Sequence, residues 1–240
     1  MKKIKDVKEL KLLANKIRQD VVKSLVEAGS GHSAGSLGMA DVLTAIYFNV
    51  LKHDPENPRW NKRDYFVLSH GHICPVLYAA LSNAGYFPEE ELLTLRKLGT
   101  RLQGHPHRLV LPGLETTSGP LGSGLSQAAG IAYGFKIDGR SNRVFCLTSD
   151  GEHDEGNIWE AVMFAAKHRL DNLIGILDRN YIQIDGNTED VMPLDSAKEK
   201  YLAFNWNVIE IDGNNMEEIV AALNSAKRLK GKPVMIIARN

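Results

Sequence analysis

Residues 144–157 have the sequence VFCLTSDGEHDEGN, and residues 173–182 have the sequence LIGILDRNYI. Each begins with an apolar run of strand length, and each run ends in side chains that carry oxygen. Two such runs separated by a helical pattern predict parallel neighbouring strands that are buried on both faces. Because open α/β sheets bind ligands beyond the carboxyl ends of their strands, we expect Asp150 and Asn180 to meet at that edge.

The residue types at this edge suit a metal-bound diphosphate. Asp150 and Asn180 offer side-chain oxygens, which a hard cation such as Mg²⁺ prefers and combines with phosphate oxygens. Gly151 has no side chain, so a diphosphate would reach the backbone there, and the N-terminus of the following helix favours its charge. An Asp-Gly pair also forms a plain turn after many strands, so this pattern alone leaves both interpretations open.

On either side of this block, apolar runs alternate with helical patterns. We expect strands at 65–68, 143–148, 172–178, 207–211 and 233–238, and helices at 7–28, 39–51, 75–84, 88–98, 121–135, 155–168, 195–203 and 215–229. The alternation predicts an α/β fold, a doubly wound and mostly parallel sheet with helices on both faces. Residues 99–120 are rich in Gly, Pro, His and Thr, which is typical of a functional or disordered loop.

Composition narrows the function classes. The chain has 240 residues, and its 29 basic and 29 acidic side chains cancel, which disfavours nucleic acid or an anionic membrane as a partner. No stretch has the length of a membrane span, and the N-terminus lacks the apolar run of a signal peptide. Cys74 and Cys146 have neither disulfide-framework nor zinc-site spacing. We therefore expect a cytoplasmic protein.

Five segments carry a more specific signal. They are GHSAGSLG (31–38), RDYFVLSHGH (63–72), GHP (104–106), LPGLETTSGPLG (111–122) and the block from 150 to 186. In that order and spacing they resemble the N-terminal, diphosphate-binding half of transketolase, from about residue 10 to the end of the chain. The block at 150–186 resembles the thiamine-diphosphate motif, with Ser149 in place of the motif's first Gly.

The resemblance implies a thiamine-diphosphate-binding fold with thiamine diphosphate and Mg²⁺, or another divalent cation such as Ca²⁺ or Mn²⁺, as cofactors. It implies that Asp150 and Asn180 bind the metal by side chains and Ile182 by its carbonyl. For the cofactor, the resemblance implies that His72 contacts the diphosphate. It implies that the rings contact Gly119, Pro120, Leu121 and Ile184. Asp150, Gly151, Asn180 and Glu152 complete the expected cofactor-binding set, and Glu152 has no specific role in it.

The resemblance also implies catalytic residues. His32 and His105 match histidines that contact the sugar near the reacting carbons, and an imidazole that titrates near neutrality suits proton transfer there. Glu155 matches an acidic residue that joins carboxylates across the interface between two cofactor sites. His70 stands where the family varies, so we expect no role for it.

The implied activity is transfer of a two-carbon ketol unit from a ketose phosphate to an aldose phosphate, with the cofactor as electron sink. We expect residues 1–240 to form a single diphosphate domain, without pyrimidine-binding and C-terminal domains. A C-terminal, pyrimidine-binding transketolase subunit is the expected partner, and the chain is expected to self-associate as a dimer. The alternatives are a domain of a longer enzyme, a subunit of another thiamine-diphosphate enzyme such as deoxyxylulose-phosphate synthase, and a non-catalytic cofactor-binding protein.

Overall fold

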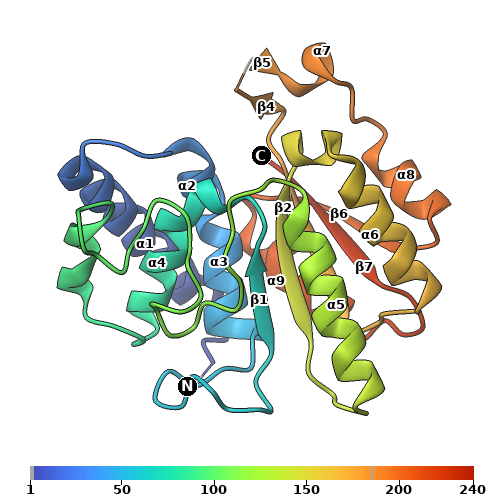
Figure 1. Ribbon diagram of the computed structural model, residues 1–240, viewed down its shortest axis with the longest axis horizontal. Coiled ribbons are helices and arrows are strands. Elements are labelled where there is room, and N and C mark those ends of the chain that lie inside the picture. The colour runs from blue at the N-terminus through green and yellow to red at the C-terminus, as the bar shows by residue number, and fades with distance from the viewer. Residues whose placement is uncertain (1–2, 185) are drawn as a thin grey trace.

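The computed structural model describes residues 3–184 and 186–240, and its centre is a five-stranded sheet (Figure 1). All neighbouring strands run parallel, in the order β1-β2-β3-β7-β6. The predicted α/β fold with a parallel sheet is therefore confirmed. The strands are β1 (Tyr65–Leu68), β2 (Val144–Ser149), β3 (Leu173–Arg179), β6 (Asn207–Asp212) and β7 (Val234–Arg239).

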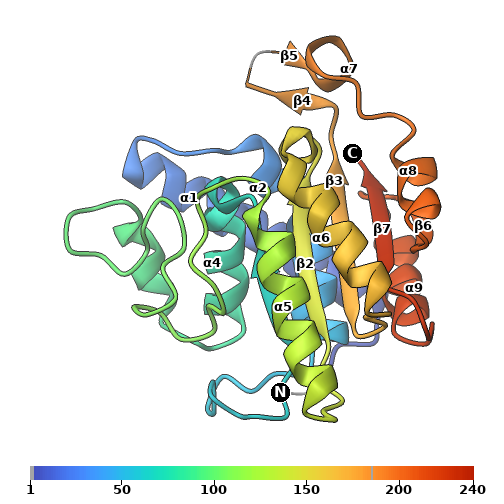
Figure 2. The same ribbon diagram turned by 45° about the vertical axis from the view of Figure 1, so that its right-hand side comes forward.

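Helices cover both faces of this sheet, as Figures 1 and 2 show. One face packs against α1 (Val7–Ala28), α3 (Ala40–Ala45) with its π-helical continuation (Ile46–Val50), α4 (Cys74–Asn83) and α9 (Met216–Ala226). The other packs against α5 (Ser123–Ile137), α6 (Gly156–Lys167) and α8 (Ala197–Ala203). Within the described residues, no helix combines the length and the apolar character needed to cross a bilayer.

The near-continuous apolar runs of the strands follow from this two-sided burial. In β2, Phe145 and Leu147 face the core of α1, α3 and α4, whereas Val144 and Cys146 face the core of α5 and α6. Successive side chains point to opposite faces of a strand, so a strand that is buried on both faces has few polar positions. Polar side chains therefore cluster where the strands end.

One predicted helix differs from the structure, and one short helix is not predicted. The expected helix at 88–98 is a short 3₁₀-helix, Glu89–Thr94, because the chain reverses at Arg96. Arg96 is left-handed (φ 61°), and its N–H donates to the carbonyl of Leu102 at 2.9 Å. The sequence predicts no helix at residues 34–38, which form α2 (Ala34–Gly38), a single helical turn before α3.

The segment after β3 contains elements that the sequence does not predict. They are a small antiparallel hairpin, β4 (Ile182–Gln183) and β5 (Gly186–Asn187), and a one-turn helix, α7 (Thr188–Val191). Tyr181 is left-handed (φ 62°), which turns the chain out of the sheet. Figure 2 shows the hairpin and α7 standing above the carboxyl ends of the strands.

Candidate cofactor and substrate site

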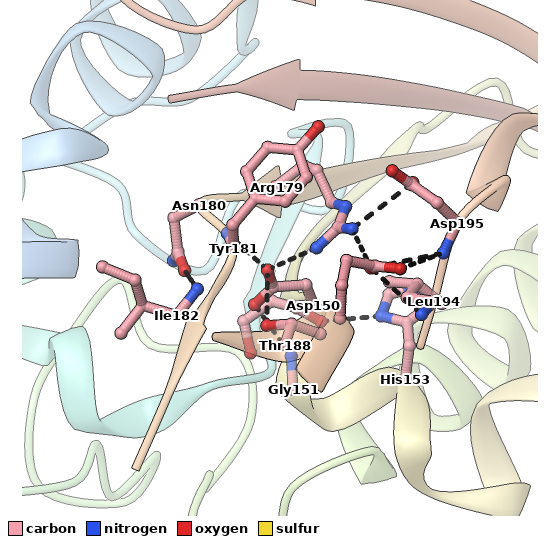
Figure 3. A network of polar contacts seen from close by, with 12 residues as sticks. Asp150, Gly151, His153, Arg179, Asn180, Tyr181, Ile182, Thr188, Leu194 and Asp195 are labelled. Atoms are coloured by element: carbon pink, nitrogen blue, oxygen red, sulfur yellow. Dashed lines mark hydrogen bonds and ion pairs between the residues drawn. The ribbon is translucent and has the colours of Figure 1, made fainter. Parts of the chain in front are cut away.

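The carboxyl ends of β1, β2 and β3 bring the two predicted metal-binding side chains to one edge. Ser149 lies opposite Asp178 in the parallel register, and the N–H of Asp150 donates to the Asp178 carbonyl at 3.2 Å. The N–H of Tyr181 donates to Asp150 Oδ2 at 2.7 Å. This confirms that β2 and β3 are parallel neighbours, and it places Asp150 beside the turn that carries Asn180 (Figure 3).

Asp150 is completely buried, and its two carboxylate oxygens differ in their partners. Oδ2 accepts hydrogen bonds from Tyr181 N, from Thr188 Oγ1 at 3.1 Å and from Arg179 Nη1 at 2.9 Å. Oδ1 accepts from the N–H of Gly151 at 2.8 Å. A carboxylate oxygen has two lone-pair sites, so Oδ1 retains one for another partner.

Asn180 is oriented by its own neighbours. Its amide nitrogen donates to Asp178 Oδ2 at 3.1 Å, and its amide oxygen accepts from the N–H of Ile182 at 2.9 Å. The side chain of Ile182 is 69% exposed and that of Ile184 is fully exposed. The turn therefore presents the Asn180 amide oxygen and two apolar side chains at the edge of the sheet.

These donors fit a hard cation only together with a diphosphate. The predicted set offers one carboxylate, one amide oxygen and the Ile182 carbonyl, which are oxygen donors of the kind that Mg²⁺ takes. Across the described residues, no group of three or more His, Cys, Asp or Glu side chains is arranged to hold an ion. The remaining coordination positions would therefore belong to phosphate oxygens and water.

The backbone at this edge explains why residue 151 is a glycine and why residue 149 can be a serine. A Cβ on Gly151 would lie 3.0 Å from Gln183 Oε1 and 3.2 Å from Gln183 Cβ, so the close approach of β4 favours glycine. The backbone of Ser149 does not have a positive φ, so its conformation does not require the glycine of the thiamine-diphosphate motif. Its N–H instead donates to Glu152 Oε2 at 3.0 Å.

Glu152 has a position that the sequence does not predict. It is completely buried, and its carboxylate accepts from the hydroxyl of Ser69 and from the N–H of Gly122 at 3.0 Å, in addition to Ser149. Burial raises the pKa of Glu152, although these hydrogen bonds oppose the shift. The side chain thereby links the end of β1, the start of α5 and the end of β2.

Three of the predicted histidines gather from separate loops. The rings of His32 and His72 lie with centroids 4.9 Å apart. A Cβ on Gly71 would lie 3.1 Å from His105 Cδ2, which places the His105 ring against the same turn. Burial, and then His32 and His105, lower the pKa of His72 to about 4. Burial, then His32 and Arg96, also lower the pKa of His105.

Arg96 belongs beside this group, although no motif or periodicity marks it in the sequence. Its Nη1 lies 3.6 Å from the position of a Cβ on Gly31, and its Nε lies 3.4 Å from that on Gly104. The exposed guanidinium thus lies between the loops that carry His32 and His105. The sequence does not predict this position of Arg96. It depends on the left-handed backbone conformation of Arg96, whereas the sequence predicts a regular helix at 88–98.

His70 is also at this edge but is enclosed. Its ring lies 3.6 Å from Glu152 Oε2 and 3.9 Å from Asp178 Oδ2, and neither ring nitrogen has a hydrogen-bond partner within the described chain. Burial, and next His72, lower its pKa to about 3. The His70 ring is thus fully buried and neutral, and its expected lack of a direct role stays a prediction.

The remaining predicted site residues lie on the surface around this edge. Leu121 is 39% exposed, Pro120 is exposed, and Gly119 is half-buried. Glu155 is exposed at the N-cap position of α6, and a Cβ on Gly122 would lie 2.7 Å from its Cβ. Their accessibility agrees with contacts to a cofactor or another chain, and those roles stay predictions.

Comparison with known proteins assigns this fold to a family. The family described as "Transketolase, thiamine diphosphate binding domain" matches residues 9–240. The 6-deoxy-6-sulfo-D-fructose transketolase subunit SqwG of Clostridium sp. (strain MSTE9) is 47% identical, over 95% of this chain and 83% of its own length. An apulose-4-phosphate transketolase subunit of Phocaeicola vulgatus is 40% identical, over 97% of this chain and 82% of its own.

Solved structures of transketolases have the same fold as this chain. Transketolase from Campylobacter jejuni has a TM-score of 0.93 and 36% identity, covering 98% of this chain and 38% of that one. Transketolase from Leishmania mexicana has a TM-score of 0.90 and 36% identity, covering 96% of this chain and 36% of that one. The chain therefore belongs to the transketolase family, as its thiamine diphosphate binding domain. It spans little more than a third of these solved transketolases, but most of the two relatives that are named as subunits.

Proposed function

We propose that this chain is the diphosphate-binding subunit of a thiamine-diphosphate- and Mg²⁺-dependent transketolase. With a pyrimidine-binding partner chain, it transfers a two-carbon ketol unit from a ketose phosphate to an aldose phosphate. The observation that carries the proposal is the convergence of His32, His72 and His105 with Asp150 and Asn180 at one edge of the sheet. The two groups meet at His70, whose ring lies 5.5 Å from that of His72 and 3.9 Å from the Asp178 carboxylate that Asn180 contacts. These side chains come from distant segments of the sequence, and a plain turn after β2 needs none of the histidines.

Each group at this edge has a chemical task in the proposal. The cofactor, when bound, supplies the electron sink for cleavage of the carbon–carbon bond. Asp150, Asn180 and the Ile182 carbonyl hold the cation, and His72 contacts the diphosphate. His32 and His105, which are exposed, hydrogen-bond the sugar hydroxyls and move protons there.

The two glutamates Glu152 and Glu155 have different tasks in the proposal. Glu152 is buried, and its carboxylate accepts hydrogen bonds from Ser69, Gly122 and Ser149, so it positions the turn at Gly122. The cofactor-binding role expected for Glu152 stays a prediction. Glu155 remains exposed beside that turn, where it would join a second copy of this chain.

A sulfonated sugar is a second candidate for the donor. The support is the 47% identity to a relative named for 6-deoxy-6-sulfo-D-fructose, which exceeds the 40% identity to the relative named for apulose 4-phosphate. A sulfonate and a phosphate are both anions that a guanidinium binds well. The exposed Arg96 between the His32 and His105 loops is available for such a group.

Reconstitution tests the function. The chain is mixed with a partner chain of about 300 residues that carries the pyrimidine-binding pattern, the size expected for two further domains. We expect sedoheptulose phosphate from pentose phosphates, or ketol transfer from 6-deoxy-6-sulfofructose, only when both chains, thiamine diphosphate and Mg²⁺ are present. Transfer by the isolated chain, or no transfer by the mixture with either donor, would refute the proposal.

A further inference from the structure

Residues 180–184 and 186–195, here called the strap, carry three of the groups that the proposed function needs. They are the Asn180 side chain, the Ile182 carbonyl and the Ile184 side chain. Figures 1 and 2 show the strap above the carboxyl ends of the strands, with β4, β5 and α7 clear of both helical layers. Something other than packing between the helices and the sheet must therefore fix its position.

Hydrophobic burial contributes little along most of the strap. Ile182 is 69% exposed, Ile184 100%, Val191 43% and Met192 56%. Burial of apolar surface begins only at Leu194, which packs in the core of α5 and α6. Because exposed apolar side chains do not fix a segment, the placement of the strap depends on polar contacts.

Those polar contacts converge on one buried ion pair, shown in Figure 3. Asp150 Oδ2 accepts from Tyr181 N and Thr188 Oγ1, which lie at the two ends of the hairpin. Arg179, which is also fully buried, donates from Nη1 to the same oxygen. The oxygen of Asp150 that holds the strap is thus distinct from Oδ1, which remains available to a cation.

The second amino group of Arg179 reaches the far end of the strap. Nη2 donates to Glu189 and lies 3.3 Å from Asp195 Oδ1. Glu189 in turn accepts from Leu194 N at 3.1 Å and Asp195 N at 3.3 Å. The guanidinium also lies 3.9 Å from the centre of the Tyr181 ring, so both its edge and its face contact the strap.

We propose that Arg179 is a positioning residue that fastens the strap to Asp150, so that the site for the cation and diphosphate is formed before the cofactor arrives. The inference rests on the proposed function of this site. A planar guanidinium suits the task because its fork can engage Asp150 with one amino group and Glu189 with the other. A preformed strap avoids the cost of ordering it on binding.

Hydrogen exchange of the chain without cofactor tests the fastening independently of catalysis. We compare wild type with Arg179→Gln and Glu189→Gln, following the amides of residues 181–184 and 186–192. Glu189→Gln leaves the buried Asp150–Arg179 pair intact. It therefore still tests the fastening if Arg179→Gln does not fold. Arg63→Gln is the matched control, because it breaks a similarly buried pair, with Glu115 at 2.6 Å, away from the strap.

We expect faster exchange confined to the strap in both variants and unchanged exchange there in Arg63→Gln. Exchange that is unchanged in both variants, or that rises equally throughout the sheet in Glu189→Gln, would overturn the proposal.

The assembled enzyme provides a second readout. The apparent KM for thiamine diphosphate should rise at least about tenfold in Glu189→Gln, as expected for loss of a charge-assisted hydrogen bond. The kcat at saturating cofactor should change far less, because the bound cofactor then orders the strap. A fall in kcat without a rise in this KM would contradict a positioning role. If the assembly transfers no ketol group while hydrogen exchange in the strap responds as expected, the proposed function is refuted but the fastening by Arg179 is not.

Discussion

The rings of His32 and His72 lie with their centroids 4.9 Å apart, inclined at 65°, although they belong to loops before and after α3. Their contact joins the first loop of the chain to the end of β1. With the pKa of His72 lowered to about 4, that ring is neutral near pH 7 and offers one donor and one acceptor. The neutral His72 ring can bind an anion or a sugar through hydrogen bonds.

The exposed histidines should govern the chemical step. His32→Ala and His105→Ala are each expected to lower kcat of the assembled enzyme by about 10²–10⁴-fold, the range for a positioned proton-transfer group. Cofactor affinity should change little, because neither ring is assigned to the diphosphate. His168→Ala is the control, since His168 packs against Tyr133 and Phe164 away from this edge. Wild-type turnover in both variants would remove the histidines from the mechanism.

The neutral state of His72 predicts a pH dependence of stability. The folded pKa is about 4, below the value of about 6.5 for an unfolded histidine. Between these values the unfolded chain binds more protons, so the free energy of unfolding falls as the pH is lowered from about 6.5 to 4.

His72→Asn removes this part of the dependence. Urea denaturation of the chain without cofactor, at pH 7 and at pH 4.5, should show that the variant loses less stability than wild type on acidification. Equal losses in the two proteins would mean that His72 is not protonated differently in the folded and unfolded states.

Two glycines of α5 should respond to alanine with opposite signs. A Cβ on Gly124 would lie 2.5 Å from the backbone Cα of Ser69, whereas a Cβ on Gly130 would meet nothing within 4 Å. Gly124→Ala should therefore destabilise the chain by about 1–3 kcal/mol through overpacking. Gly130→Ala should stabilise it by about 0.5–1 kcal/mol through helix propensity. Chemical denaturation of the isolated chain measures both, and a shared sign would contradict the packing of α5 on β1.

The sequence predicts the sheet and the meeting of β2 with β3 because buried parallel strands leave a strong apolar signal that ends in polar residues. It does not predict β4, β5 and α7, since two-residue strands and a one-turn helix have no measurable period. The contacts of Arg179 with Glu189 and Asp195 depend on the path of that segment in space. The placement of Glu152 likewise depends on how Ser69 and Gly122 approach β2.

Asp150 and Asn180 are proposed to bind a divalent cation together with the diphosphate of the cofactor. Calorimetry of the assembled enzyme with thiamine diphosphate, in the presence and absence of Mg²⁺, tests it most directly. Asp150→Ala and Asn180→Ala should each lower the affinity in Mg²⁺ by at least about tenfold, or about 1.4 kcal/mol. Asp138→Ala, at the far end of α5, is the control and should leave the affinity unchanged. Wild-type affinity in both site variants, together with binding that is indifferent to Mg²⁺, would contradict the account.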